Sequence, residues 1–332
     1  MKNLFWIFPD RSSLKQQPLE YEHYWKEYIE AAKRVNFRVQ VISAEAIDVV
    51  YLSDGTVHTF VDSQPVCPTD TIFVTELYTF PHQQRDILSQ ITTFKALQLQ
   101  GFYLPIDPEL SIVMNDKLAT HLFFHRLREQ GMSILPSIRL IAGRDLDYHN
   151  LEQLLTQFSF PLLVKPASWA GGIGVTLAHN LIELRSLLGL ASGFDCAMII
   201  QPWISSPELV DYRVFFVDGK PHTILARRAQ QGNIVANLNR GGKAELVEMP
   251  EGLLSPALLA GQLIHLPFFC LDFLFDGQSY WLSEVELDGG ILDVDRGRMQ
   301  RLFMDRFNAY NNAHETWLET IEERFPFRSN SH

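Results

Sequence analysis

Phe160-Pro161-Leu162-Leu163-Val164-Lys165-Pro166 predicts a short buried strand, which continues into a turn that contains Ser168 and has glycines at Gly171, Gly172 and Gly174. Glycines leave the backbone amides of such a turn open to phosphate oxygens, and Lys165 adds a positive charge at the strand end. The spacing matches neither the Walker lysine motif nor the dinucleotide-binding glycine motif. Taken alone, the stretch is most simply interpreted as a glycine-rich turn.

Three acidic residues lie on a predicted antiparallel hairpin later in the chain. Its strands, 270–275 and 280–286, are joined by an Asp-Gly pair that is typical of tight turns. Asp272 lies on the first strand, and Glu284 and Glu286, two residues apart, face the same side of the second. Acids in apolar strands are costly without a partner, and oxygen ligands suit Mg²⁺. A magnesium site and a row of acids facing water are both consistent with this pattern.

A basic segment, residues 227–242, interrupts an otherwise acidic chain. It contains Arg227, Arg228, Asn237, Asn239 and Arg240 together with flexible glycines. Arginine binds carboxylate and phosphate oxygens through two parallel hydrogen bonds. By itself the segment is more safely interpreted as a solvated loop between strands.

The first third of the chain predicts an open α/β unit. Apolar strands are expected at 4–8, 37–42 and 71–75 and a helix at about 20–34, and an Asp54-Gly55 pair predicts a hairpin at the edge. A second α/β segment is expected from residue 111 onward. Two antiparallel hairpins are expected after residue 201, and a helix at about 298–324.

Composition narrows the function classes. A formal net charge of −11 over 332 residues argues against a protein that binds nucleic acid or an anionic membrane. No segment approaches the roughly 20 apolar residues of a membrane span, so a cytoplasmic protein is expected. The three cysteines, Cys67, Cys196 and Cys270, lie far apart and are expected to be buried, reduced thiols.

In their order along the chain, these elements resemble the ATP-grasp superfamily, specifically carboxylate-amine ligases similar to bacterial glutathione synthetase and the ribosomal-protein glutamate ligases. The resemblance covers about residues 114–290. It also rests on Asn115-Asp116-Lys117 before a helix that is expected to run to about residue 129, on the strand 199–204 and on Asp211-Tyr212-Arg213. It implies the ATP-grasp fold, of mixed α/β class with α+β subdomains. An N-terminal open α/β domain, 1–110, would precede two α+β subdomains, 111–200 and 201–325, that enclose the nucleotide, and 326–332 would be a tail.

The resemblance also implies roles for particular residues. ATP and one or two Mg²⁺ ions, with Mn²⁺ as an alternative, are the expected cofactors. The triphosphate would contact Lys117, Lys165 and the turn that contains Ser168, Gly171, Gly172 and Gly174. Adenine would meet Gln201, Pro202, Trp203 and Ile204, and the ribose Glu208 or Asp211. Metal ligands would be Asp272, Glu284 and Glu286, with Asn237 near the metals. Arg213, Arg227 and Arg240 would steady the acyl phosphate or the transferring phosphoryl group.

One position departs from the family pattern. Related proteins usually have Glu-Val-Asn where this chain has Glu284-Val285-Glu286. A carboxylate still binds magnesium, but the added negative charge changes the balance between metal and triphosphate. The number of metal ions is therefore left open.

The function implied by the resemblance is ATP-dependent ligation. A substrate carboxylate would attack the terminal phosphate of ATP and form an acyl phosphate, and an amine, or a thiol, would then displace phosphate. The partners would be a small molecule or peptide with a carboxylate and an amine-type nucleophile, with no nucleic acid and no membrane; related ligases are often dimers or tetramers. Two alternatives are a non-catalytic ATP-binding regulatory or scaffold protein and a phosphotransferase with a phosphohistidine relay. The latter is disfavoured because neither His222 nor His265 has a relay context.

Overall fold

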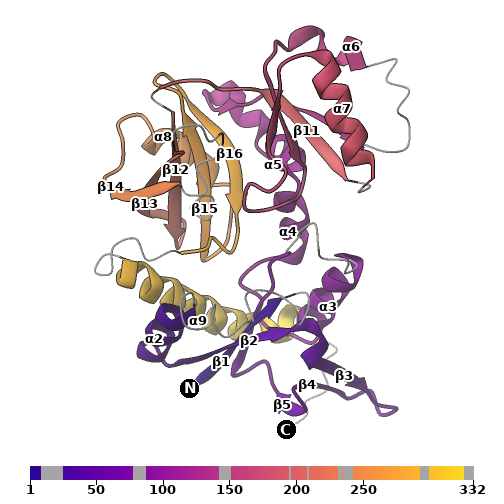
Figure 1. Cartoon of the computed structure of the whole chain (residues 1–332). Coiled ribbons are helices and arrows are strands. Elements are labelled where there is room, and N and C mark those ends of the chain that lie inside the picture. Colours follow the sequence, from indigo (N-terminus) through magenta and orange to yellow (C-terminus); the bar gives the residue numbers. More distant parts are fainter. Residues whose placement is uncertain are drawn as a thin grey trace.

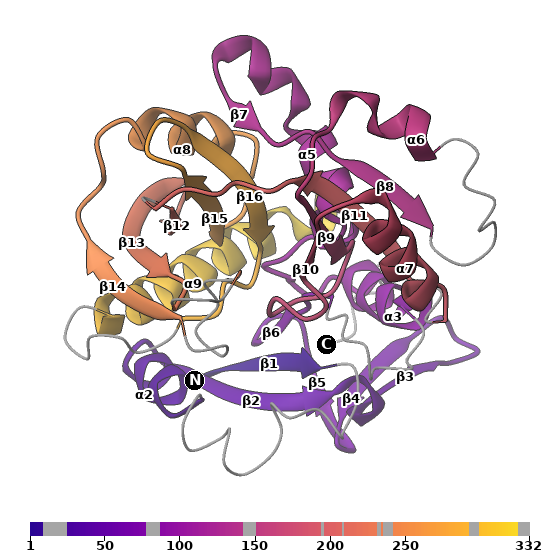
Figure 2. The same ribbon diagram turned by 45° about the horizontal axis from the view of Figure 1, so that its top comes forward.

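The computed structural model describes residues 1–8, 25–77, 87–141, 151–193, 196–207, 209–230, 234, 242–291 and 299–324. Figure 1 shows an N-terminal unit at the bottom and two lobes above it, with α4 and α5 running between them. Figure 2 turns the same ribbon so that the two lobes lie side by side. None of the described helices is both long and apolar enough to cross a lipid bilayer.

The N-terminal unit is an open α/β sheet, as predicted. Three parallel strands lie in the order β2-β1-β6, and a small antiparallel sheet of β3, β4 and β5 lies beside them. The predicted hairpin at Asp54-Gly55 joins β3 to β4, which pair from Ile47 to Val61. The elements are β1 (Lys2–Phe8), α2 (Lys26–Arg34), β2 (Phe37–Ser43), η3 (Ala44–Ala46), β3 (Ile47–Tyr51), β4 (Val57–Val61), β5 (Gln64–Val66), β6 (Thr71–Val74), α3 (Ile87–Leu99) and α4 (Pro108–Asn115).

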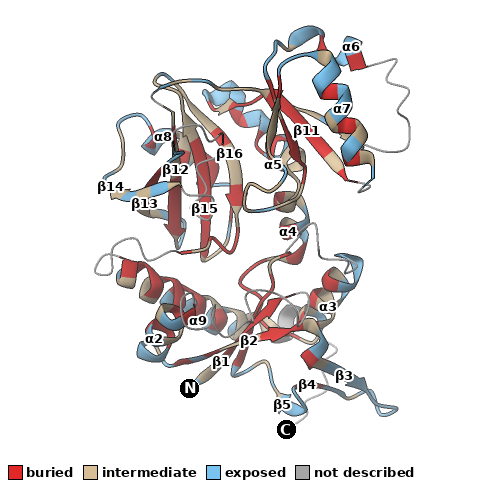
Figure 3. Ribbon diagram, in the orientation of Figure 1, coloured by how far each residue is buried: buried red, intermediate tan, exposed pale blue. Residues whose placement is uncertain are grey.

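Strand β1 is buried on both faces because apolar residues alternate between two cores. Trp6 belongs to the core that contains α2 and the C-terminal helix α9 (Met299–Arg324), whereas Phe5 and Ile7 pack with Phe94 of α3. Side chains of a strand point alternately to opposite faces, so a continuous apolar run fits a sheet covered on both sides. Figure 3 shows most of β1 in red as buried.

The first lobe is a four-stranded antiparallel sheet in the order β10-β9-β11-β8. Its core includes Leu184 and Leu188 of α7. The elements of this segment are α5 (Lys117–Phe123), η4 (His125–Gln130), β7 (Ser133–Ile134), β8 (Ile138–Ile141), α6 (Leu151–Leu154), η5 (Leu155–Gln157), β9 (Leu162–Pro166), β10 (Thr176–Ala178), α7 (Leu181–Ser192) and β11 (Ala197–Pro202).

The second lobe is a six-stranded sheet in the order β14-β13-β12-β15-β16-β7. It is antiparallel except where β16 meets β7, and it contains both predicted hairpins. Its elements are β12 (Val210–Val217), β13 (Lys220–Arg228), β14 (Lys243–Val247), α8 (Leu254–Gly261), β15 (Phe268–Phe275) and β16 (Tyr280–Glu286). Helix α9 packs on α2 and also contacts β12 and β15, so one apolar core joins this sheet to β1. The domain boundaries at 110 and 200 stay predictions.

Two expectations need correction. The helix expected from Asn115-Asp116-Lys117 begins as predicted, because Asp116 accepts hydrogen bonds from the amides of Leu118 and Ala119. It continues only to Phe123, however, and 125–130 form a 3₁₀ helix that ends at Gly131 with φ +90°. Cys67 is exposed rather than buried, while Cys196 and Cys270 are buried free thiols.

Candidate active site

One face of the six-stranded sheet carries rows of opposite charges. Cross-strand pairing places Asp211 of β12 beside Arg227 of β13, and Arg213 of β12 beside Asp272 of β15. Asp272 in turn pairs with Glu284 of β16. Directly opposed residues of neighbouring strands interact closely, so the register alone brings these side chains together.

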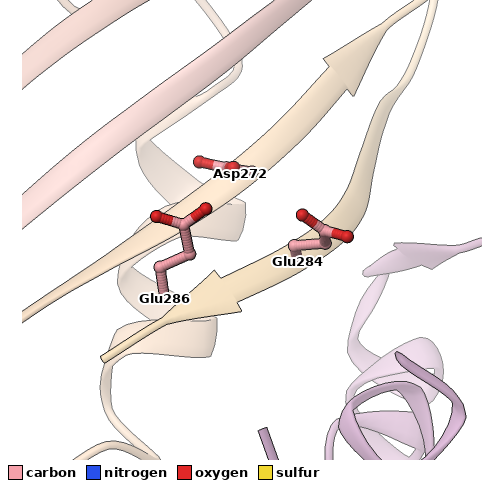
Figure 4. Close-up of side chains that lie close together, drawn as sticks. All are labelled: Asp272, Glu284 and Glu286. Carbon is pink, nitrogen blue, oxygen red and sulfur yellow. The ribbon is translucent and has the colours of Figure 1, made fainter. Parts of the chain in front are cut away.

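The three acids predicted on the last hairpin converge. Oxygen atoms of Asp272, Glu284 and Glu286 lie within 4.8 Å of one another, which is close enough to hold a metal ion (Figure 4). Asp272 is buried and the two glutamates are half-buried. The ligand set is made of carboxylate oxygens alone, which suits a hard divalent cation such as Mg²⁺. The donor set therefore fits the expected metal.

Two arginines hold this acidic group. Arg213 donates two hydrogen bonds to Asp272, at 2.9 and 2.8 Å, and lies 2.6 Å from Glu286. Arg227 bridges Asp272 and Asp211 at 2.7 Å each. Burial raises the pKa of Asp272, but the two arginines outweigh it and lower the pKa to about 2. Burial raises the pKa of Glu286 despite the attraction of Arg213.

Two lysines approach the acids from the other lobe. The Nζ atom of Lys117, at the start of α5, lies 3.2 Å from Glu284 and donates a hydrogen bond to the carbonyl of Trp169 at 3.0 Å. Lys165, on β9, is buried. Its burial, with the repulsion of Lys117, lowers its pKa to about 8 although Glu284 attracts it. The two lysines can bind an anion such as a phosphate, and the neighbouring acids can bind a cation that accompanies this anion.

A cavity of about 420 Å³ opens between the two lobes at this point. Gln201, on β11, points its amide nitrogen at Ser137 Oγ, 2.9 Å away, and His121 lies 3.1 Å from the same oxygen. Within the described residues, three buried polar atoms along this cavity have no hydrogen-bond partner: Gln201 Oε1, Asp211 Oδ1 and Arg227 Nε. Buried polar atoms without partners are rare in native proteins, so these atoms indicate a polar ligand.

The comparisons with known proteins agree with this geometry. The model of the RimK-like ATP-grasp domain matches residues 116–298, which is more than half of the chain. The chain belongs to the RimK-like ATP-grasp family. One relative is the "Probable alpha-L-glutamate ligase" of Histophilus somni (strain 2336), which is 26% identical over 51% of this chain and 55% of that protein. Another is the "Probable alpha-L-glutamate ligase 2" of Shewanella frigidimarina (strain NCIMB 400), which is 29% identical over 61% of this chain and 65% of that protein. The match thus spans less than two thirds of these relatives.

Solved structures share the fold along nearly the whole chain. A D-alanine–D-alanine ligase from Bacillus anthracis, complexed with ATP, has a TM-score of 0.63 at 17% identity and covers 98% of this chain and 100% of that one. The D-cycloserine synthetase DcsG has a TM-score of 0.66 at 16% identity and covers 94% and 99%. The predicted ATP-grasp fold is therefore confirmed.

Most of the site residues that the resemblance to ATP-grasp ligases implied meet at the cavity. Those that line it are Lys117, Lys165, Gly171, Gly172, Gln201, Pro202, Trp203, Ile204, Asp211, Arg227, Asp272 and Glu284. Ser168 and Glu286 line a neighbouring cavity instead, and Arg213, which is buried and bonded to Asp272, lines neither cavity. Gly174 lines neither cavity. Glu208, Asn237 and Arg240 lie outside the described residues.

Some residues that line the two cavities or contact their walls were missed by the sequence analysis. Ser283 and Leu274 line the nucleotide-sized cavity, and a shift in the pairing of β15 with β16 after Asp272 leaves Ser283 without a directly opposed residue. His121 contacts the backbone carbonyl of Ser283 at 3.3 Å. A register shift leaves no mark in the sequence. Glu76, which follows β6, had a usable signal, because ligands of parallel sheets bind beyond the carboxyl ends of the strands.

Proposed function

We propose that the chain is an ATP-dependent carboxylate-amine ligase that forms an amide bond and releases ADP and phosphate. The observation that carries the proposal is the meeting of two lysines, two arginines and three convergent acids at one end of the cavity. A protein that only bound a nucleotide would not need buried arginines among the acids. Family membership supports the same chemistry.

ATP would occupy the cavity of about 420 Å³, which lies within the range of roughly 300–1,000 Å³ typical of small-molecule sites. Adenine would lie against Gln201–Ile204, where the unpaired Gln201 Oε1 offers an acceptor to an amino group. Lys117 and Lys165 would contact the phosphates, with the glycine-rich turn, Gly171 and Gly172, beside them. The free Oδ1 of Asp211 is the described candidate for a ribose hydroxyl.

Asp272, Glu284 and Glu286 would hold Mg²⁺, with Mn²⁺ as an alternative. A divalent cation at this position neutralises phosphate charge as it develops. Arg213 and Arg227 are fixed by Asp272 before any substrate arrives, so their charges need little rearrangement in the transition state.

The reaction would proceed in two balanced steps. A carboxylate oxygen of the first substrate attacks the terminal phosphorus of ATP, so that an acyl phosphate forms and ADP leaves. The amine of the second substrate, after its ammonium form has released one proton to solvent, then attacks the acyl carbon; the carbon–nitrogen bond forms, the bond to phosphate breaks, and the nitrogen loses a second proton to solvent. Arg227, which lines the cavity, would stabilise the charge on the transferring phosphoryl group, and Arg213 would hold Asp272 and Glu286 in place beside it.

The names of the relatives make L-glutamate the first amine to test, with peptides and other amino acids as further candidates. A thiol nucleophile stays an open alternative. The homo-oligomer and the cytoplasmic location expected from the sequence also stay predictions.

The test begins with thermal unfolding of the full chain with and without millimolar Mg²⁺ and ATP. Binding to the folded state raises stability by mass action, by about 2.7 kcal/mol at a hundredfold excess over Kd. We expect a magnesium-dependent rise in the wild type that is lost in Lys165→Ala and Glu284→Ala and kept in Lys243→Ala, whose side chain is exposed on β14. ADP release is then measured with amino acids as substrates. Absence of any shift in the wild type contradicts the nucleotide site, and a shift without ADP release across the panel favours the scaffold alternative.

A further inference from the structure

A second cavity, of about 190 Å³, adjoins the nucleotide-sized one. The two share Lys117, Trp169 and Glu284 in their linings, so they meet where the phosphates of ATP would lie. The second cavity extends from there toward the N-terminal unit, where Glu76 and Met114 line it. A substrate in it would face the site of phosphoryl transfer.

Four carboxylates line the second cavity: Glu76, Glu284, Glu286 and Asp288. Three of them have a cationic partner. Glu284 lies 3.2 Å from Lys117, Glu286 lies 2.6 Å from Arg213, and Asp288 lies 2.5 Å from Arg306. Their charges are thus balanced before any ligand binds.

Glu76 is the exception. It is half-buried directly after β6, and no lysine or arginine among the described residues forms an ion pair with it. The backbone of Asp288 hydrogen-bonds to its carboxylate, and Arg306 attracts it, but Arg306 is already paired with Asp288. Burial, together with the charges of Asp288 and Glu286, raises the pKa of Glu76. Among the described residues, Glu76 is therefore the carboxyl group of this cavity without a cationic partner, and a bound cation would oppose the rise in its pKa.

The rest of the lining limits the size and nature of the occupant. Phe8, Leu77, Met114, Val285 and Leu287 supply apolar side chains. The volume is below the roughly 300 Å³ at which sites for drug-sized ligands begin. It suits a group about as large as one amino acid, with a cationic end toward Glu76 and an apolar body.

We propose that this cavity is the subsite of the amine substrate, and that Glu76 selects a small primary amine by pairing with its ammonium group. A desolvated carboxylate gains most from an opposite charge, whereas a thiol or an acylated amine would leave it unpaired. Glu76 is thus a specificity-determining residue, and the nucleophile is an amine of amino-acid size. This inference rests on the proposed ligase function.

The test is isothermal titration calorimetry on the full chain, with and without Mg²⁺ and the non-hydrolysable ATP analogue AMP-PNP. The probe is L-alaninamide, which carries an ammonium group and no carboxylate. The matched probe, N-acetyl-L-alaninamide, lacks the charge. We expect wild-type protein to bind L-alaninamide about tenfold or more tightly than the acetylated probe, because a buried charge pair contributes that much or more.

Two variants complete the design. Glu76→Gln should weaken L-alaninamide about tenfold or more while leaving the affinity for AMP-PNP within about twofold. Glu109→Gln makes the same chemical change on α4, where the side chain is 76% exposed and paired with Lys95, and should bind both probes as the wild type does. Circular dichroism checks the fold of each variant.

Equal binding of the two probes to the wild type, or no binding of L-alaninamide, overturns the proposal without recourse to any variant. Unchanged L-alaninamide affinity in Glu76→Gln also overturns it. Failure of the proposed function is distinguishable, because it appears as a lack of AMP-PNP binding in the wild type. Since the amine titration is also made without nucleotide, the subsite is tested in either case.

Discussion

Replacing the buried Lys165 by methionine is expected to stabilise the protein while it weakens nucleotide binding. Lys165 is 7% exposed, and burial lowers its pKa from the ordinary 10.5 to about 8. At pH 7 the lysine is charged in both the folded and the unfolded chain, so the free energy of unfolding is reduced by the full cost of burying this charge. That cost is about 3 kcal/mol, since one pKa unit corresponds to about 1.4 kcal/mol. Methionine has a similar length and no charge to bury.

The sign of the pH dependence follows from proton binding. Between pH 8 and 10.5 the unfolded chain keeps the Lys165 proton and the folded chain releases it, so wild-type stability rises with pH relative to Lys165→Met. The advantage of the variant in unfolding free energy should fall from about 3 kcal/mol at pH 7 to about 1 kcal/mol at pH 9.5. Glu284 keeps Lys117 as a partner in the variant, which limits secondary effects.

The assay is urea unfolding at both pH values, followed by thermal unfolding with Mg²⁺ and ATP. Lys243→Met, an exposed lysine to methionine change on β14, should alter stability by less than about 0.5 kcal/mol at either pH. The nucleotide-dependent rise in stability should be lost in Lys165→Met and kept in the control. A Lys165→Met protein that is less stable than the wild type at pH 7, or whose advantage does not change with pH, refutes the reasoning.

Three further outcomes are expected. Asp272→Asn should lower the free energy of unfolding by about 3–5 kcal/mol in urea, because two arginines lose the buried charge that they share, and a loss below about 1 kcal/mol would contradict this account. Burial lowers the pKa of His121 from 6.5 to about 4, so the unfolded chain takes up a proton first as the pH falls through this window. The His121 contribution to wild-type stability should therefore drop by about 2 kcal/mol between pH 7 and 4.5, and His121→Gln should remove that part of the drop in urea titrations. Gly174→Ala should be more destabilising in thermal unfolding than Gly55→Ala by about 1 kcal/mol. Both glycines have positive φ, +74° and +88°, but only at position 174 would the new Cβ lie 2.9 Å from Pro166 Cγ. Equal losses of stability in the two variants would exclude this clash.

Local signals sufficed for much of the fold and of the site. Asp-Gly pairs marked the hairpins that join β3 to β4 and β15 to β16, and Asp116 marked the start of α5. Two residues of spacing put Glu284 and Glu286 on one face, and the structure brings both to Asp272. In each case the deciding interaction is within a few residues, or within one hairpin, so the amino-acid order contains it.

The partners of the charged residues were not predictable in this way. Arg213 was expected to face a phosphoryl group, but it also joins Asp272 to Glu286, 59 and 73 positions away in the chain. The helix expected from 117 to 129 divides at Phe123, although its sequence has no proline or glycine before Gly131. Side-chain packing across elements decides such points, and propensity is a weak guide to them.

The amino-acid sequence by itself was enough to predict the family, most of the strands and helices, and the lysines and acids that meet at the cavity and on the last hairpin, because these depend on local pattern and on motifs in order. Only the tertiary structure decided that α9 returns to α2 at the start of the chain, and that Glu76 lines a cavity with Glu286 and Asp288. Contacts between residues more than 200 positions apart follow from how apolar faces pack together and leave no periodic or short-range signal in the sequence.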